Sequence, residues 1–144
     1  MKAVLKALTD SYPHVNAISV RRRSPVLRHR HPPADDGKRG SAGVISSALI
    51  DDIANNGDRA AWKRGEFAPF FGGLDMSYRS GWYVIHDEPA MLFAMGIHGQ
   101  NLFVDRSNRL VIAKRSSQGA PIDQQMSALT HRAVAEIRRC LVGK

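Results

Sequence analysis

Residues 96–100 read Gly-Ile-His-Gly-Gln, and this is the segment in which chemistry is easiest to place. Glycines at 96 and 99 remove side chains where a substrate would approach the backbone, and an outward-facing amide on an edge strand can stabilise a developing oxyanion. Taken alone, such glycines more often mark a β-bulge packed closely on a helix. His98 adds an imidazole, and a structural hydrogen-bonding histidine is more common in such a place than a general base.

The strands that must position this segment follow from the residues around it. Aromatic and β-branched residues at 78–85 predict one strand, and residues 91–104 predict a second, which the two glycines interrupt. Polar residues at 105–108 are typical of a hairpin turn, so residues 110–115 should return as an antiparallel partner. The expected sheet has about three strands.

Helices flank these strands in the sequence. Ser46 or Ser47 can cap a short helix through Ile53, and residues 59–63 can add a further helical turn. Asp123 begins a longer segment with apolar residues at steps of three and four: Met126, Leu129, Ala133, Val134, Ile137 and Leu141. We expect this C-terminal helix to cover one face of the sheet, which gives an α+β fold.

The chain divides into two unequal parts. With 144 residues and 43% apolar content it has room for one domain, which we place at residues 44–144. Residues 1–43 are expected to be a disordered basic tail, because residues 20–40 show no helical or strand period and contain adjacent prolines. The net charge of +8 suggests an acidic partner such as nucleic acid, but the arginine-rich stretch has no interleaved aromatic residues to stack on bases.

Composition also argues against several classes of protein. No segment approaches the roughly 18 consecutive apolar residues of a membrane span, and residues 1–8 do not read as a secretory signal, so we expect a cytoplasmic protein. The single cysteine, Cys140, is expected to be a half-buried core thiol. His86, His98 and His131 lack ligand spacing, so neither a metal nor a cofactor is expected.

Several blocks of the chain resemble a known family. The blocks are Asp51-Asp52-Ile53, Gly57-Asp58-Arg59-Ala60-Ala61, Ser77-Tyr78-Arg79, Trp82-Tyr83, Gly96-Ile97-His98-Gly99-Gln100 with Asp105, and Val111-Ile112-Ala113-Lys114 with Ser116. With these blocks, the stretch from Leu49 to Arg115 is similar to the C-terminal third of the β-lactamase-related serine hydrolases, in the 6-aminohexanoate-dimer hydrolase and esterase branch. The resemblance implies part of a β-lactamase/transpeptidase-like fold.

The resemblance implies roles for the glycine-containing segment. The family's third motif, often Lys-Thr-Gly, falls on Ala94-Met95-Gly96, where the lysine and threonine are absent. In the dimer-hydrolase branch the next residue donates its backbone amide to the oxyanion hole, and that residue here is Ile97. Gly96, His98 and Gly99 are then expected to line the substrate site.

The reactive half of such a site is not found in the sequence. No serine is followed three positions later by lysine, and no tyrosine is followed two positions later by asparagine, so the family's Ser-x-x-Lys and Tyr-x-Asn motifs are missing. The expected function is therefore a fragment of an amide or ester hydrolase, inactive by itself. A frame error upstream would explain the gap, and the gene's other reading frames test that hypothesis.

Two alternatives stay open. The chain can be a basic module whose arginine tail contacts nucleic acid or another anionic surface, with the hairpin domain only as its scaffold, in which case binding weakens steeply with salt. It can also be a half-enzyme that a separate chain completes. An exposed sheet edge would favour such pairing or self-association.

Overall fold

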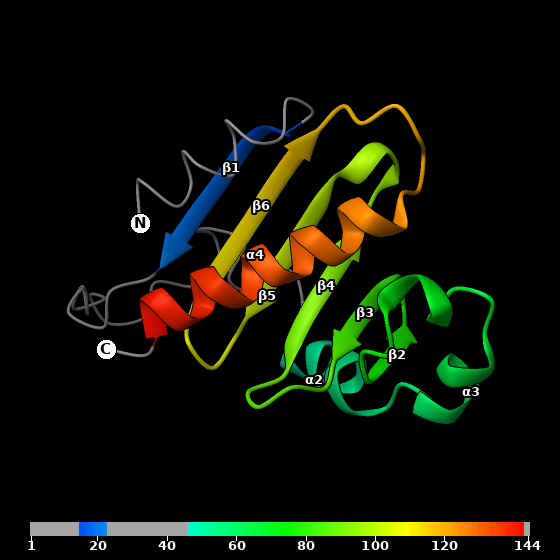
Figure 1. Ribbon diagram of the computed structural model, residues 1–144. Helices are drawn as coiled ribbons and strands as arrows, with labels where there is room; N and C mark the ends of the chain where they lie inside the picture. The colour runs from blue at the N-terminus through cyan, green and yellow to red at the C-terminus, as the bar shows by residue number, and fades with distance from the viewer. Residues whose placement is uncertain (1–14, 23–45, 143–144) are drawn as a thin grey trace, which may run out of the picture.

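The computed structural model describes residues 15–22 and 46–142 (Figure 1). Within these residues, six strands form one antiparallel sheet, with three α-helices and two short 3-10 turns around it. In chain order the elements are β1 (Val15–Arg22), α2 (Ser47–Asn55), α3 (Arg59–Arg64), η1 (Ala68–Phe71), β2 (Met76–Arg79), β3 (Trp82–Ile85), β4 (Met91–Met95), η2 (Ile97–Gly99), β5 (Asn101–Asp105), β6 (Leu110–Ser116) and α4 (Gln124–Val142).

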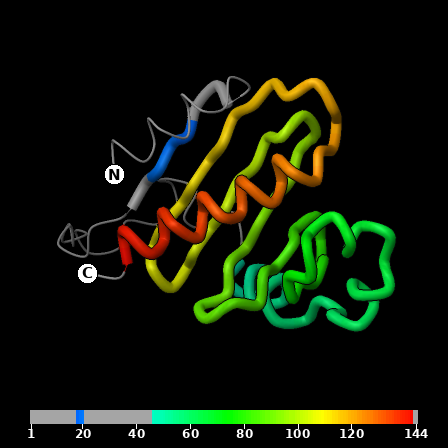
Figure 2. The backbone as a smooth tube through the Cα atoms, in the orientation of Figure 1, coloured from blue at the N-terminus to red at the C-terminus, as the bar shows by residue number. Residues whose placement is uncertain are grey.

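The strand order across the sheet is β1-β6-β5-β4-β3-β2 (Figure 2). The α+β class and the C-terminal helix are confirmed, but the expectation of about three strands was wrong. Residues 76–85 form a hairpin, because Ser80 and Gly81 both have positive φ and turn the chain back. Residues 91–105 form a second hairpin, with η2 as its turn. The sequence pattern had merged each hairpin into one strand.

Strand β1 adds the sixth strand at one edge. It pairs antiparallel with β6, with Ile18 opposite Lys114 and Val20 opposite Ile112. Residues 15–22 had been assigned to the disordered tail, so for them that prediction was wrong. The reason is alternation: Ile18 and Val20 point to the same face and pack against the core, although basic residues follow directly. Residues 1–14 and 23–43 of the expected tail lie outside the described residues.

Helix α4 covers one face of the sheet, crossing β6, β5 and β4 (Figure 1). Its start agrees with the prediction, since the Asp123 carboxylate accepts the amide of Met126 at 3.0 Å. Val134 and Ile137 are buried in the main core together with strand residues such as Phe93 and Phe103, whose rings stack at 4.7 Å. The ring of His131 stands edge-on against both phenylalanines. This face holds most of the core.

The opposite face is covered more sparsely. Helix α2 packs Ile53 against Val84 and Leu92, which form a second, smaller core cluster. The Ser46 hydroxyl accepts the amide of Leu49 at 3.2 Å and so caps α2, as the sequence predicted. Beyond α2 the face is left more open, and Val111 on β6 is 37% exposed.

One end of α4 is tied to the sheet by a buried ion pair. Arg138 donates from Nε to Asp105 at 2.9 Å and from Nη2 to the carbonyl of Pro89 at 2.6 Å. Asp105 is 1% exposed and also accepts the backbone and side-chain amides of Asn108. This Arg138–Asp105 clip therefore joins the helix to the β5–β6 turn and to the loop before β4.

Candidate functional site

The glycine-containing segment forms the turn between β4 and β5. Gly96 donates its amide to the carbonyl of Gln100 at 2.8 Å, which closes the hairpin, and residues 97–99 make one 3-10 turn inside it. The edge strand expected from the sequence was a misreading, because β4 lies inside the sheet. Its register with β3 ends at Phe93, however, so the residues from 94 onward extend past their neighbour.

The backbone amide of Ile97 is available in this turn. The amides of Gly96, His98 and Gln100 donate to Gln100, Pro121 and Ile97 carbonyls, respectively. Within the described residues, neither Ile97 nor Gly99 donates a turn or loop hydrogen bond. The Ile97 residue is 63% exposed, which places it at the surface of the turn. An N–H without an acceptor, in a residue at the surface, is what an oxyanion donor needs before substrate binds.

His98 is held by contacts on both its backbone and its side chain. Its amide donates to the carbonyl of Pro121 at 2.9 Å, and its Nδ1 lies 3.0 Å from the carbonyl of Gln118. A carbonyl oxygen accepts only, so Nδ1 carries the proton in this contact. His98 also has a φ of 57°, in the left-handed region. These contacts fasten the turn to the segment that leads into α4.

The two glycines differ in what they make possible. Gly99 has a φ of 77°, and a Cβ at this position would lie 2.3 Å from Oε1 of Gln118. Glycine is therefore required at 99 both by the backbone and by the close side chain. At Gly96 the φ is −103° and a Cβ would meet its nearest neighbour at 3.4 Å, an ordinary contact. Only one of the two has a steric reason to be glycine.

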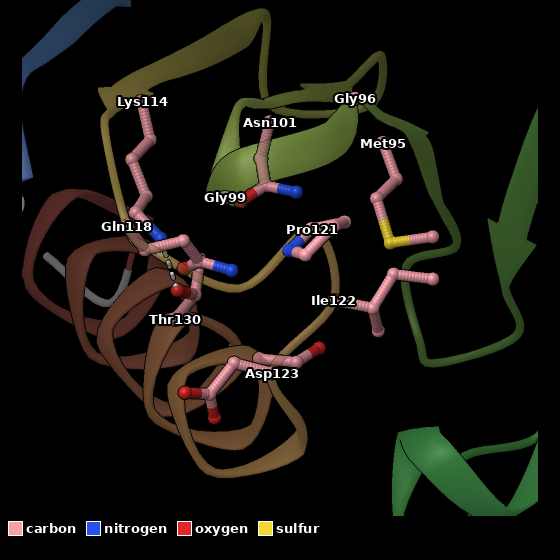
Figure 3. Close-up of a pocket in the computed structure, with 11 residues that line it drawn as sticks. Met95, Gly96, Gly99, Asn101, Lys114, Gln118, Pro121, Ile122, Asp123 and Thr130 are labelled. Carbon is pink, nitrogen blue, oxygen red and sulfur yellow. Dashed lines mark hydrogen bonds between the residues drawn. The ribbon is translucent and has the colours of Figure 1, made fainter.

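A polar cluster of Lys114, Gln118 and Thr130 lies beneath the turn (Figure 3). The sequence analysis did not predict this cluster. Lys114 is 6% exposed and donates from Nζ to the Thr130 hydroxyl at 2.8 Å. Burial lowers the pKa of this lysine. The signal was present: Leu110, Ile112 and Lys114 alternate on one face of β6, so an inward-facing Lys114 follows from the period of a strand.

Open space lies on the other side of the turn. A shallow depression of about 350 Å³ adjoins Gly96, Gln100 and Leu102 on the face not covered by α4. This volume suits a small organic molecule.

Within the described residues, no three His, Cys, Asp or Glu side chains gather closely enough to hold a metal ion. In the same part of the chain, no helix has the length and apolar character to cross a membrane.

Comparison with known proteins points in one direction. No family model matches the chain. It is 28% identical over 107 residues to the 6-aminohexanoate-dimer hydrolase of Paenarthrobacter ureafaciens, a match that covers 74% of this chain and 27% of that protein. The chain is similar to 6-aminohexanoate-dimer hydrolases. This confirms the resemblance that the sequence blocks indicated.

A solved structure agrees at the level of the fold. The structure comes from Bacillus anthracis, and its assignment as a 6-aminohexanoate-dimer hydrolase is provisional. It matches with a TM-score of 0.55 at 24% identity, over 74% of this chain and 26% of that one. The chain thus spans about a quarter of the length of the two dimer hydrolases that it matches. Their remaining three quarters have no counterpart in the match.

Proposed function

We propose that this chain supplies one wall of a hydrolase cleft that acts on amide or ester bonds, with the Ile97 amide as an oxyanion donor. The substrate class is taken from the name of the Paenarthrobacter ureafaciens relative, and small linear amides such as 6-aminohexanoate dimers head the candidates. Gly96, His98 and Gly99 shape the turn that presents the amide.

The unused Ile97 N–H carries this proposal. When a nucleophile attacks a carbonyl carbon, an electron pair moves onto the carbonyl oxygen, and a fixed N–H that faces this oxygen lowers the barrier. The neighbouring amides of Gly96, His98 and Gln100 already have acceptors inside the protein. The Ile97 amide has none within the described residues and stands at an exposed position.

In this proposal the nucleophile comes from outside this chain, an expectation supported by the lack of a Ser-x-x-Lys motif in the sequence. We therefore expect the purified chain to leave nitrocefin and p-nitrophenyl esters unchanged and to resist labelling by a fluorophosphonate. Mass spectrometry of the labelled chain checks this directly. Stoichiometric modification of one serine would show that the chain carries its own nucleophile.

The role of Ile97 can be tested in a completed enzyme. In a fusion, the part of this chain that aligns with the Paenarthrobacter ureafaciens hydrolase replaces the 107-residue matched region of that enzyme. Ile97→Pro removes the N–H, and proline is well tolerated at the first position of a helical turn after an extended residue such as Gly96. We expect kcat for the amide dimer to fall by about 100- to 1,000-fold.

A matched variant separates the backbone from the side chain. Ile97→Ala keeps the N–H and shortens only an exposed side chain, so it should retain most of the activity of the fusion. Circular dichroism checks that both variants fold. A folded Ile97→Pro fusion with the kcat of the parent fusion would refute the oxyanion role.

The nucleic-acid alternative depends on the arginine-rich tail and stays a prediction, and the ion pairs of the folded part concern other arginines. Five arginines of the folded part contact carboxylates of the same chain, and such paired charges are less free to bind phosphate. The pairs are Arg59–Asp75, Arg79–Asp52, Arg106–Asp51, Arg138–Asp105 and Arg139–Glu136. Binding to an anionic surface, completion by a separate chain and self-association stay predictions.

A further inference from the structure

The side chain of Gln118 is buried with one of its two polar ends unused. It is 6% exposed, and Nε2 donates to the carbonyl of Ala120 at 3.3 Å. Oε1 has no hydrogen-bond partner among the described residues. Turning the amide over would direct Oε1 at the Ala120 carbonyl, which only accepts, so the orientation is set by that contact. A buried acceptor without a donor costs about 1–3 kcal/mol.

The ammonium group of Lys114 lies close to Gln118 and has N–H donors without acceptors among the described residues. An ammonium has three N–H donors, and the contact with Thr130 uses one of them. That threonine in turn donates to the carbonyl of Met126 at 2.7 Å, so its own proton is already committed. No carboxylate of the described residues forms an ion pair with Lys114. The buried charge thus lacks full compensation.

A small cavity joins these two groups (Figure 3). Its volume is about 20 Å³, and Asn101, Asp123, Ser127 and Thr130 are among the other residues that line it. A cavity needs about 10–15 Å³ to hold one water molecule, and that water needs two to four polar partners. The cavity meets both requirements, and it is too small for an organic ligand.

We propose that this cavity binds one water molecule, which accepts a hydrogen bond from Lys114 Nζ and donates one to Gln118 Oε1. Water is the ligand that serves both groups. A metal cation would be repelled by the ammonium, whereas a chloride ion has no proton to donate to the amide oxygen. The bound water gives Lys114 a second acceptor and gives Gln118 Oε1 its donor.

The water site reaches the exposed turn through Gln118. The carbonyl of this residue contacts His98 Nδ1, and its side chain lies against Gly99. Holding Gln118 in place therefore holds the two residues that follow Ile97. Gln118 and Lys114 are in this way positioning residues for the Ile97 amide, and this consequence, unlike the water site itself, rests on the proposed function.

Oxygen-17 relaxation dispersion of the solvent counts long-lived internal waters and is insensitive to proton exchange from lysine. In the full-length chain, Gln118→Met should remove one such water, because its side chain fills a similar volume without an acceptor. Gln125→Met is the control, since Gln125 is an exposed glutamine on α4. It should leave the count unchanged. Equal counts in the parent chain and in Gln118→Met would overturn the water site.

A double-mutant cycle gives a second, independent measurement. Lys114→Met and Gln118→Met should each lower the Tm, while the double variant should lose less than the sum of the two, because both partners of the water are then gone. Strictly additive Tm losses would contradict the bridge. So would a crystal structure in which Lys114 Nζ bonds Gln118 Oε1 directly.

Amide hydrogen exchange links the site to the turn. If the water positions the turn, the His98 amide should exchange at least tenfold faster in Gln118→Met than in Gln125→Met. Loss of the water with unchanged exchange would refute the positioning role and leave the water site standing. If instead the Ile97→Pro fusion keeps its activity, the proposed function fails while both of these results stand.

Discussion

The two ends of helix α4 are fastened to the sheet in different ways. At its C-terminal end the Arg138–Asp105 clip satisfies a buried carboxylate with an arginine and with the amides of Asn108. At its N-terminal end Lys114 meets Thr130, and Gln118 keeps an acceptor without a donor inside the protein. We expect the C-terminal end, whose buried carboxylate has all its partners, to contribute more to stability. The N-terminal end supports the turn that presents Ile97, and a water molecule is proposed to complete the hydrogen bonding of Gln118 there.

The largest effect should come from breaking the clip. Arg138→Met leaves Asp105 buried without its charged partner, and losing one member of a buried ion pair costs about 3–5 kcal/mol. Urea denaturation of the purified chain measures the loss in free energy of unfolding. Arg139→Met is the control, because its pair with Glu136 is exposed and screened by solvent, so its loss should change stability little. Equal losses in the two variants would contradict the special role of the clip.

The second effect tests whether glycine is required in the turn that lies against the N-terminal end of α4. Gly99→Ala places a methyl group 2.3 Å from Gln118 Oε1 in a left-handed backbone conformation, which together should cost about 2–4 kcal/mol. At Gly96 the same substitution meets its nearest atom at 3.4 Å and should cost less than about 1 kcal/mol. Thermal unfolding of both variants checks the difference. If Gly96→Ala proves the more harmful, the two glycines have been assigned the wrong roles.

The third effect concerns His131, between the two ends of the helix. Burial among the rings of Phe71, Phe93 and Phe103 lowers its pKa to about 4, the nearby Asp87 opposing this shift and Lys114 adding to it. The fold thus favours the neutral ring. Its contribution is fully present above the unfolded pKa of about 6.5 and is lost as the pH falls toward 4.

Between pH 7 and pH 5 this group should remove about 2 kcal/mol of stability. Urea denaturation at both values measures the change, and His131→Leu supplies the comparison because it cannot be protonated. The variant should lose less stability over this interval than the parent chain does. An identical pH dependence in both proteins would show that other groups dominate.

Local chemistry made much of the fold predictable. Asp123 and Ser46 cap α4 and α2 because their oxygens accept first-turn amides, a contact that depends on neighbours in sequence. The polar turn at residues 105–108 was predictable for the same reason. The hairpins at residues 76–85 and 91–105 were missed because a tight turn at Ser80-Gly81 or Ile97–Gly99 interrupts the apolar pattern too briefly to separate two strands.

Of the candidate site, the sequence by itself determined the segment and its resemblance, since the order of residues 96–100 within the surrounding blocks pointed to dimer hydrolases. Tertiary structure alone decided that Gly99 faces Gln118, that the buried Lys114 meets Thr130 of α4, and that Ile97 keeps an unused amide in an exposed turn. The reason is that these contacts are made between residues of the β4–β5 turn, of β6 and the segment after it, and of the first half of α4, which lie far apart in the sequence. Their distances follow from the register of the sheet and the packing of the helix, which no local pattern records.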